Sequence, residues 1–264
     1  MCILAGDRFF QLGIIRNENM HLRFLAALLF AAPLLYFAGE GAQEEARGSS
    51  QQARQGSIGY ANVRVRRTRI LFPRLTRFRD AKVMREVNRQ IDAATREFGC
   101  EGQGGKNSYY KVKSKVTYAD NDVFSIYASA EYYCNTAYPT NDANISQTFD
   151  LRTGKLIQFE ELFKSYERDR QEILRAIFAE EIARSEKLAA SGKPREETCE
   201  GDPELYSLER LEGSSYSFNF SSAGLQVQPQ WPHVIEACAK IVTVPYSKLE
   251  RFAAPGGLLS RVKK

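Results

Sequence analysis

The chain has 264 residues, a length that allows one large domain or two small ones. With 43% hydrophobic and 11% aromatic residues it can build a substantial core, which excludes wholesale disorder. The net charge of +5 is lower than nucleic-acid-binding proteins usually carry, so nucleic acid is not an expected partner. A weakly basic surface would also suit anionic cell-wall polymers or membrane surfaces.

Residues 1–42 are expected to be an upstream extension and a targeting segment. Met20–Arg23 forms a short basic start, Phe24–Ala38 is almost wholly apolar, and small residues follow at Gly39–Gly41. This is the pattern of a cleavable secretory signal peptide. An uncleaved anchor is the alternative, although the apolar run is shorter than the ~20 residues that span a bilayer comfortably. Residues 43–57 are polar and lack periodicity, and are predicted to be a flexible leader.

The first predicted half of the fold covers residues 58–143. Tyr60 to Phe72 mixes β-branched residues with arginines, which indicates a strand broken by a bulge and ending at Pro73. A helix should follow, because Asp80 is a suitable N-cap and Gly99 a suitable stop. Its apolar residues recur at spacings of three and four, the helical period: Met84, Val87, Ile91, Ala94 and Phe98.

The same half continues with an antiparallel hairpin that turns at Ala119–Asp122. On the first strand, lysines on one face alternate with apolar residues on the other. The return strand alternates in the same way, and its predicted inner face consists of Phe124, Ile126, Ala128, Ala130, Tyr132 and Cys134.

The second predicted half covers residues 144–254. Asn144–Leu151 alternates with period two, and Arg152–Lys155 supplies a tight turn in which Gly154 can take positive φ. The longest predicted helix is Ser165–Leu188. The remaining predicted elements are two strands joined at Ser222–Gly224, a final strand Lys240–Val244, a short helix Pro245–Phe252 and a frayed basic tail, residues 255–264. This order predicts an α+β fold, a mostly antiparallel sheet with two main helices packed on one face.

The cysteines agree with export from the cytosol. Apart from Cys2 they form an even set, Cys100, Cys134, Cys199 and Cys238, which in an exported chain predicts two disulfides. Four cysteines allow three connectivities. We favour Cys100–Cys134 and Cys199–Cys238, because each pair then lies within one half of the chain. There is no CxxC pair and one histidine remains after the targeting segment, so neither a metal site nor another cofactor is expected.

Three motifs give the chain a family resemblance. The first is Phe72-Pro73 before a helix that contains Val87-Asn88 and Ile91. The second is the sequence Phe-Asp-Leu-Arg-Thr-Gly-Lys at Phe149–Lys155, followed by Glu161-Leu162-Phe163. The third is Val-Pro-Tyr-Ser-Lys-Leu at Val244–Leu249. With these motifs, residues 60–252 resemble the paired extracytoplasmic domains of unknown function found in the RsiV anti-sigma factor and ahead of the catalytic domain of PdaC-type peptidoglycan deacetylases.

The resemblance implies a PdaC-like first half, an RsiV-like second half and the fold of the RsiV ectodomain. One departure is Cys238-Ala239-Lys240, which stands where the family commonly has a glycine. It suggests that a disulfide fixes this loop instead. We expect neither an anti-sigma segment before the domain nor a deacetylase domain after it, so the sensing and deacetylating roles are not carried over.

No residue set predicts a reaction. Thr148–Asp150 is similar to the start of a deacetylase metal motif, but Leu151 replaces the second aspartate, so no metal site is predicted. His233 has no GxSxG elbow to complete a triad and is expected to be a surface or hydrogen-bonded histidine. Glu160 and Glu161 are adjacent and should complement the dipole of a helix start.

The candidate binding surface is basic. The lysines of the hairpin share one strand face with an aromatic residue, and arginines lie on a strand that could neighbour it. Such a surface could hold an acidic glycan or an acidic patch of a protein. The alternative is a solvated face or an edge protected by lysines. The candidate ligand-binding residues are Lys111, Lys113, Lys115, Arg64, Arg66 and Tyr109, with Arg69 beside them.

The leading hypothesis is a non-catalytic binding module, periplasmic or secreted, with no membrane span after signal cleavage. Its expected partner is a cell-wall glycan or, as the resemblance alone implies, a wall-directed protein such as lysozyme. The alternatives are a carbohydrate-active envelope hydrolase with an unrecognised carboxylate site, and a structural envelope protein. A buried pair of acidic side chains in a cleft would favour the hydrolase, and an open basic face would favour the binding module.

Overall fold

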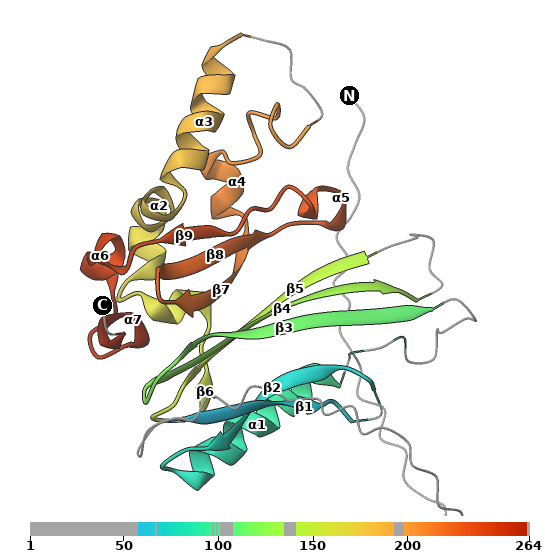
Figure 1. The fold of residues 1–264 in the computed structure, drawn as a ribbon. Helices are drawn as coiled ribbons and strands as arrows, with labels where there is room; N and C mark the ends of the chain where they lie inside the picture. Colours follow the sequence, from blue (N-terminus) through green and yellow to red (C-terminus); the bar gives the residue numbers. More distant parts are fainter. Residues whose placement is uncertain are drawn as a thin grey trace, which may run out of the picture. The chain divides into compact units, whose positions relative to one another are not determined.

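The computed structural model describes residues 58–66, 68–96, 98, 100, 108–134, 141–192 and 198–262. Within these ranges the chain forms antiparallel sheets and several helices, so the predicted α+β fold is confirmed (Figure 1). The predicted targeting segment, the leader and the helix stop at Gly99 lie outside the described residues.

The first seven elements form a hairpin, a helix and a four-stranded sheet. The sheet has the order β3-β4-β5-β6, and each neighbouring pair is antiparallel. The elements are β1 (Gly59–Arg64), β2 (Leu71–Arg77), α1 (Ala81–Thr95), β3 (Tyr109–Ala119), β4 (Val123–Tyr133), β5 (Asn141–Asp150) and β6 (Lys155–Leu156).

The prediction of one bulged strand from Tyr60 to Phe72 is wrong. The chain reverses between β1 and β2, where the Val65 N–H donates to the Ile70 carbonyl over 2.8 Å. Pro73, expected to end the strand, lies inside β2 opposite Asn62. A proline fits there because in the described part of the chain β2 pairs with β1 alone, so one edge needs no backbone donor.

Helix α1 begins as predicted and is tied to the strands by its side chains. Asp80 Oδ1 accepts hydrogen bonds from the backbone N–H groups of Lys82 (2.8 Å) and Val83 (3.2 Å). Asn88 bonds both the N–H and the carbonyl of Leu75 in β2, at 3.0 and 2.9 Å. The side chain of Gln90 donates to the Gly154 carbonyl over 2.7 Å, which holds the β5–β6 turn against the helix. The buried face of the helix consists of Val83, Val87, Ile91 and Thr95, whereas Ala94 of the predicted stripe is exposed.

The central strands of the four-stranded sheet have side chains in both hydrophobic clusters of the fold. Phe124, Ile126 and Phe149 pack with α1, β1 and β2. Val123, whose side chain alternates with that of Phe124, belongs to the cluster of the C-terminal elements. The sheet is therefore covered on both faces, which explains why successive residues of a strand, whose side chains point to opposite faces, are both buried.

The C-terminal elements form a second, three-stranded sheet, order β7-β8-β9, with short helices around it. They are η1 (Phe159–Leu162), α2 (Tyr166–Ile177), α3 (Ala179–Ala190), α4 (Leu208–Glu212), β7 (Ser215–Ser221), β8 (Gly224–Gln230), α5 (His233–Glu236), β9 (Val242–Val244), α6 (Tyr246–Leu249), η2 (Glu250–Phe252) and α7 (Leu258–Arg261).

The predicted long helix Ser165–Leu188 is two helices, α2 and α3. Phe178 ends the first and precedes the second, with φ −102° and ψ 27°. Its fully buried ring contacts Tyr206 and Tyr216, so core packing determines the break. Residues from α2 and α3 lie in a different hydrophobic cluster from those of α1. The main helices therefore do not share one face as predicted.

Buried hydroxyl groups and an ordered C-terminal segment connect the C-terminal elements to the four-stranded sheet. Ser125 and Thr148 bond to each other over 2.7 Å, and the Phe220 N–H of β7 donates to Ser125 Oγ over 3.0 Å. In the segment predicted to be a frayed tail, Leu258 and Leu259 of α7 are buried. Together with Val262, these residues belong to the core of the C-terminal elements.

The predicted disulfide pairing is confirmed. Cys100 is bonded to Cys134 and Cys199 to Cys238, with Cα atoms 5.1 and 5.2 Å apart. None of the helices that the structure describes is both long and apolar enough for a bilayer crossing.

Candidate functional site

A cavity of about 540 Å³ lies on the lysine-bearing face of the four-stranded sheet. We call it the polar pocket. Strands β3, β4 and β5 supply one wall, and β8 with the end of α5 and the segment after it supplies the other. Its lining residues are Lys111, Lys113, Ser129, Ala130, Glu131, Asn144, Gln228, Glu236, Ala237 and Ala239.

The alternation of β3 places the lysines on the pocket side. Val112, between two of them, packs against the opposite cluster with α1, so Lys111 and Lys113 point the other way. Lys111 is held by Glu131 on the neighbouring strand, with Nζ and Oε1 3.7 Å apart, and by the ring of Tyr109, whose centroid is 4.7 Å from Nζ. Lys113 makes no ion pair with any described residue. It is thus the pocket cation whose charge is available to a ligand.

The deepest polar side chain of the pocket is Gln228, which is 7% exposed. Its Nε2 donates to the Ala239 carbonyl over 2.8 Å, which fixes the orientation of the amide. The other amide atom, Oε1, is buried and accepts no hydrogen bond in the described part of the chain. Buried acceptors are nearly always paired, because an unpaired one loses its hydration without compensation. Gln228 Oε1 is therefore an unpaired acceptor closed off from solvent, within a residue that lines the cavity.

Polar groups of β4 and β5 extend the lining. The Tyr127 hydroxyl donates to Asn144 Oδ1 over 2.7 Å, which orients the Asn144 amide at the cavity wall. The phenol of a tyrosine is protonated at neutral pH, and burial raises the pKa of Tyr127 further, so its hydroxyl remains a donor.

The two carboxylates of the pocket are not the buried pair that a hydrolase would favour. The Glu131 side chain is 49% exposed and faces Lys111, and Glu236 is only partly buried. Neither carboxylate is fully buried, whereas the general acid of a glycosidase commonly stands in an apolar pocket.

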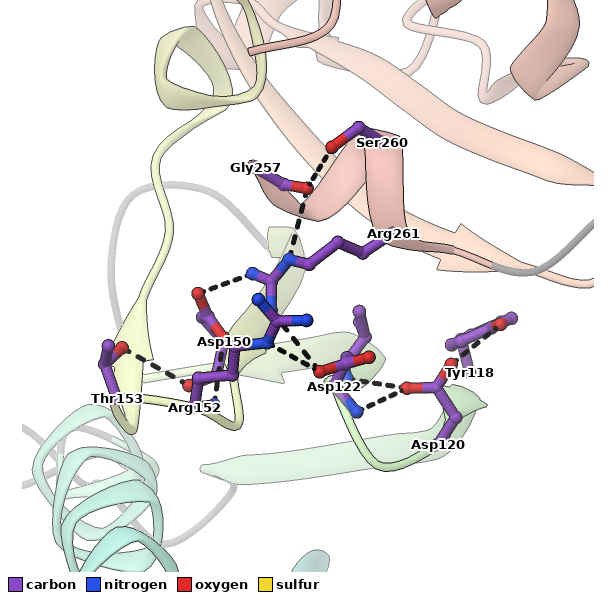
Figure 2. Close-up of polar contacts among 10 residues, drawn as sticks. Tyr118, Asp120, Asp122, Asp150, Arg152, Thr153, Gly257, Ser260 and Arg261 are labelled. Carbon is purple, nitrogen blue, oxygen red and sulfur yellow. Dashed lines mark hydrogen bonds and ion pairs between the residues drawn. The ribbon is translucent and has the colours of Figure 1, made fainter. Parts of the chain in front are cut away.

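A second polar group, the Asp–Arg cluster (Asp122, Asp150, Arg152 and Arg261), lies where the β3–β4 and β5–β6 turns meet α7 (Figure 2). Arg261 donates from Nη2 to Asp150 Oδ2 over 2.6 Å, and its Nη1 lies 3.5 Å from Asp122 Oδ1. Arg152 Nε donates to the same Asp122 oxygen over 2.9 Å. These charges pair with one another, so the cluster holds elements together.

Two residues of the incomplete metal motif at Thr148–Asp150 bond to other partners. Thr148 bonds to Ser125, and Asp150 is paired with Arg261, so neither is directed at a shared ligand position. Within the described residues, no three His, Cys, Asp or Glu side chains are placed to hold a metal ion.

Two of the six predicted binding residues, Lys111 and Lys113, line the pocket. Tyr109 contributes through the contact of its ring with Lys111, and Lys115 lies further along β3, with Nζ 5.8 Å from the centre of the Tyr127 ring. The structure does not bring the arginines to this site. Arg64, Arg66 and Arg69 are exposed on the β1–β2 hairpin, whose core residues pack on the other face of the sheet.

The remaining residues considered for chemistry were the glutamates at Glu160-Glu161 and His233. The Glu161 carboxylate accepts from the Gln158 N–H over 2.9 Å and pairs with Lys155. The Gln158 contact is half of a capping box at the start of η1, and both contacts lower the pKa of Glu161. The side chain of His233 lies outside the described residues.

Sequence reasoning missed the part of the pocket that comes from the C-terminal half. Glu131 could have been found, because the hairpin register places it opposite Lys111. No sequence pattern around Gln228 indicates a place in the pocket, because only the packing of the two sheets brings this residue close to the lysines.

No protein-family model and no curated protein sequence matches the chain. It is similar to the crystal structure of a DUF3298 family protein from Pseudomonas aeruginosa PAO1, with 10% identity, a TM-score of 0.40, and coverage of 75% of this chain and 93% of that chain. It is also similar to a DUF3298 family member from Bacteroides fragilis, with 11% identity, a TM-score of 0.42, and coverage of 72% and 85%. At this level the likeness carries no inference about function, and membership of the RsiV- and PdaC-related family stays a prediction.

Proposed function

We propose that the chain is a non-catalytic binding module of the periplasm or cell envelope, and that its polar pocket takes an acidic cell-wall glycan. The observation that carries the proposal is Lys113, an exposed cation that lines the cavity and makes no ion pair with a described residue. Polar groups from both sheets surround it, as in sites that orient a sugar by hydrogen bonds.

Two further features support this proposal. The cavity volume falls within the roughly 300–1,000 Å³ of ordinary ligand sites. The two disulfides fit an oxidising compartment, where cell-wall polymers are found. A protein ligand such as lysozyme rests on the family resemblance alone and enters as an outcome of the test.

The test is binding of soluble peptidoglycan fragments and of lysozyme to the purified chain, over a range of salt. Lys113→Ala should weaken fragment binding about tenfold, since it removes a charge-assisted hydrogen bond. Lys115→Ala is the matched control: it removes an equal charge from the same strand face outside the pocket lining. Equal losses in both variants, no fragment binding at any salt, or binding of lysozyme alone would refute the proposed site.

A further inference from the structure

Strand β1 has an outer edge whose backbone groups are not used by the described part of the fold. At the reversal into β2 the Val65 N–H donates to the Ile70 carbonyl, so these two residues form a hydrogen-bonded pair of the antiparallel ladder. Hydrogen-bonded and non-bonded pairs alternate along such a ladder. The N–H and C=O groups of Tyr60, Asn62 and Arg64 therefore point away from β2, and no described residue bonds to them. We call these groups the open edge.

The outer edge of β2, by contrast, is closed. The same alternation directs the groups of Leu71, Pro73 and Leu75 outward from this strand. Ser114 Oγ donates to the Leu71 carbonyl over 3.1 Å, and a proline has no N–H to offer. The Asn88 side chain bonds both backbone groups of Leu75. These contacts agree with the derived alternation, and they leave the open edge of β1 as the side of the hairpin to which a further strand can bond.

The side chains of β1 leave room for such a strand. All residues from Tyr60 to Arg64 are exposed, including the apolar Val63, whose exposed fraction is 40%. A segment that runs beside β1 would gain backbone hydrogen bonds along the open edge, and it would meet exposed side chains on both faces of the strand. This is the arrangement by which an extended peptide adds to the edge of a sheet.

The charge of the hairpin determines which peptide fits. Residues 58–79 contain seven arginines and neither aspartate nor glutamate. Arg64, Arg66 and Arg69 are exposed and make no ion pair with any residue that the structure describes. Pairing with the same strand of a second copy would bring two such basic hairpins together, and like charges across an interface disfavour association. An acidic segment is complementary to this edge.

We propose that β1 is a docking edge for an acidic, extended segment of another protein, which adds to the hairpin as a third strand antiparallel to β1. Its carboxylates lie beside Arg64 and Arg66, and its backbone bonds to the open edge. Opposite Ala61 and Val63, where side chains of neighbouring strands approach most closely, it carries apolar residues. The polar pocket lies elsewhere, because it is lined from β3, β4, β5 and the C-terminal elements.

The experiment follows amide hydrogen exchange of the full chain by NMR with an end-capped peptide, Asp-Glu-Val-Thr-Val-Thr. Antiparallel docking brings its acidic end beside Arg64. We expect it to bind about tenfold more tightly at low salt than the neutral peptide Asn-Gln-Val-Thr-Val-Thr, because exposed ion pairs contribute modestly and are screened by salt. Binding should slow exchange at the amides of Tyr60, Asn62 and Arg64, whereas those of Ala61 and Val63 should be protected already by β2.

Three variants test the edge and the charge separately. Asn62→Pro removes one N–H of the open edge but no bond of the β1–β2 ladder, so it should weaken binding of the acidic peptide at least tenfold with an unchanged Tm. Arg64→Gln should reduce the preference for the acidic peptide. Arg85→Gln is the matched control, because it removes an equal charge from an exposed position of α1, outside the hairpin, and should leave the preference unchanged.

Four results would overturn the proposal. Protection of the three open-edge amides before peptide is added would show that a second copy or the chain's own N-terminal segment occupies the edge. Equal affinity for the two peptides would remove the requirement for acid. Binding that survives Asn62→Pro but is lost in Lys113→Ala would place the peptide in the polar pocket. No binding at any salt would mean that Arg64 keeps other strands away instead. Comparing the two peptides on the unsubstituted chain keeps the test valid even if a variant does not fold.

Discussion

Replacing both Cys199 and Cys238 by serine removes the cross-link that holds the pocket wall after α5. The two residues are 39 positions apart, so the bond closes a loop of about 40 residues in the unfolded chain. The loop-entropy relation then gives a stabilisation of about 4 kcal/mol at 25 °C. Because domains are stable by only about 5–15 kcal/mol, this variant should lose a large part of its free energy of unfolding.

Urea unfolding at equilibrium measures this loss, and the other disulfide provides a matched control. Cys100 and Cys134 are 34 positions apart, so their replacement by serine should also lower the free energy of unfolding by about 4 kcal/mol. The two double variants should nevertheless differ in ligand binding. Cys238 stands between two lining residues, and its carbonyl accepts from the Tyr206 hydroxyl over 3.2 Å.

We therefore expect only the Cys199/Cys238 variant to bind glycan fragments more weakly than its remaining folded fraction explains. A loss of less than about 1 kcal/mol in its free energy of unfolding would refute the loop-entropy reasoning. Unchanged affinity would refute the role of the disulfide in fixing the pocket wall.

Three further substitutions test the packing. Gly224→Ala should destabilise the chain by about 3 kcal/mol, because Gly224 has φ +147° and a Cβ there would lie 2.2 Å from the Val244 carbonyl oxygen. The measurement is the Tm, which should fall; an unchanged Tm would contradict this reasoning. Arg261→Met should lower the free energy of unfolding in urea by about 1–3 kcal/mol, since the largely buried Asp150 loses its guanidinium partner. A neutral result would show that the pair is not stabilising. Backbone hydrogen bonds lower the pKa of Asp80, so its stabilisation should be complete above the unfolded-state pKa and disappear as pH falls through the folded-state pKa. Asp80→Asn, which still caps α1, should remove this part of the acid sensitivity, and an unchanged pH profile would contradict the assignment.

The features that sequence predicted correctly depend on neighbours in the chain. The turn at Gly154 needs one residue with positive φ, and the structure has φ 79° there. The cap at Asp80 needs only the following turn of helix, and the β3–β4 hairpin follows from alternation and a short Asp-rich turn. In each case the stabilising contacts lie within a few residues, so the pattern is visible locally.

The features that were missed depend on partners far along the chain. Phe178 interrupts a helical pattern because two tyrosines from later elements pack against it. The pocket is lined both by lysines of β3 and by Gln228 of β8, which is more than a hundred positions away in the sequence. No periodic pattern in the sequence predicts that these residues lie close together. The basic residues of the β1–β2 hairpin were grouped with the lysines by charge, whereas the reversal at Val65 takes them to the other face.

The two faces of β4 pack against different hydrophobic clusters, and this determines how the protein should behave when its chain is cut into two fragments. A cut between β6 and η1 would sever the backbone between the two hydrophobic clusters, and neither disulfide spans that point. The N-terminal fragment would then expose Val123 and the hydroxyl of Ser125, which the C-terminal fragment covers. Two pieces made in this way should remain associated by complementation rather than behave as independent domains, and separate expression of either should yield insoluble material.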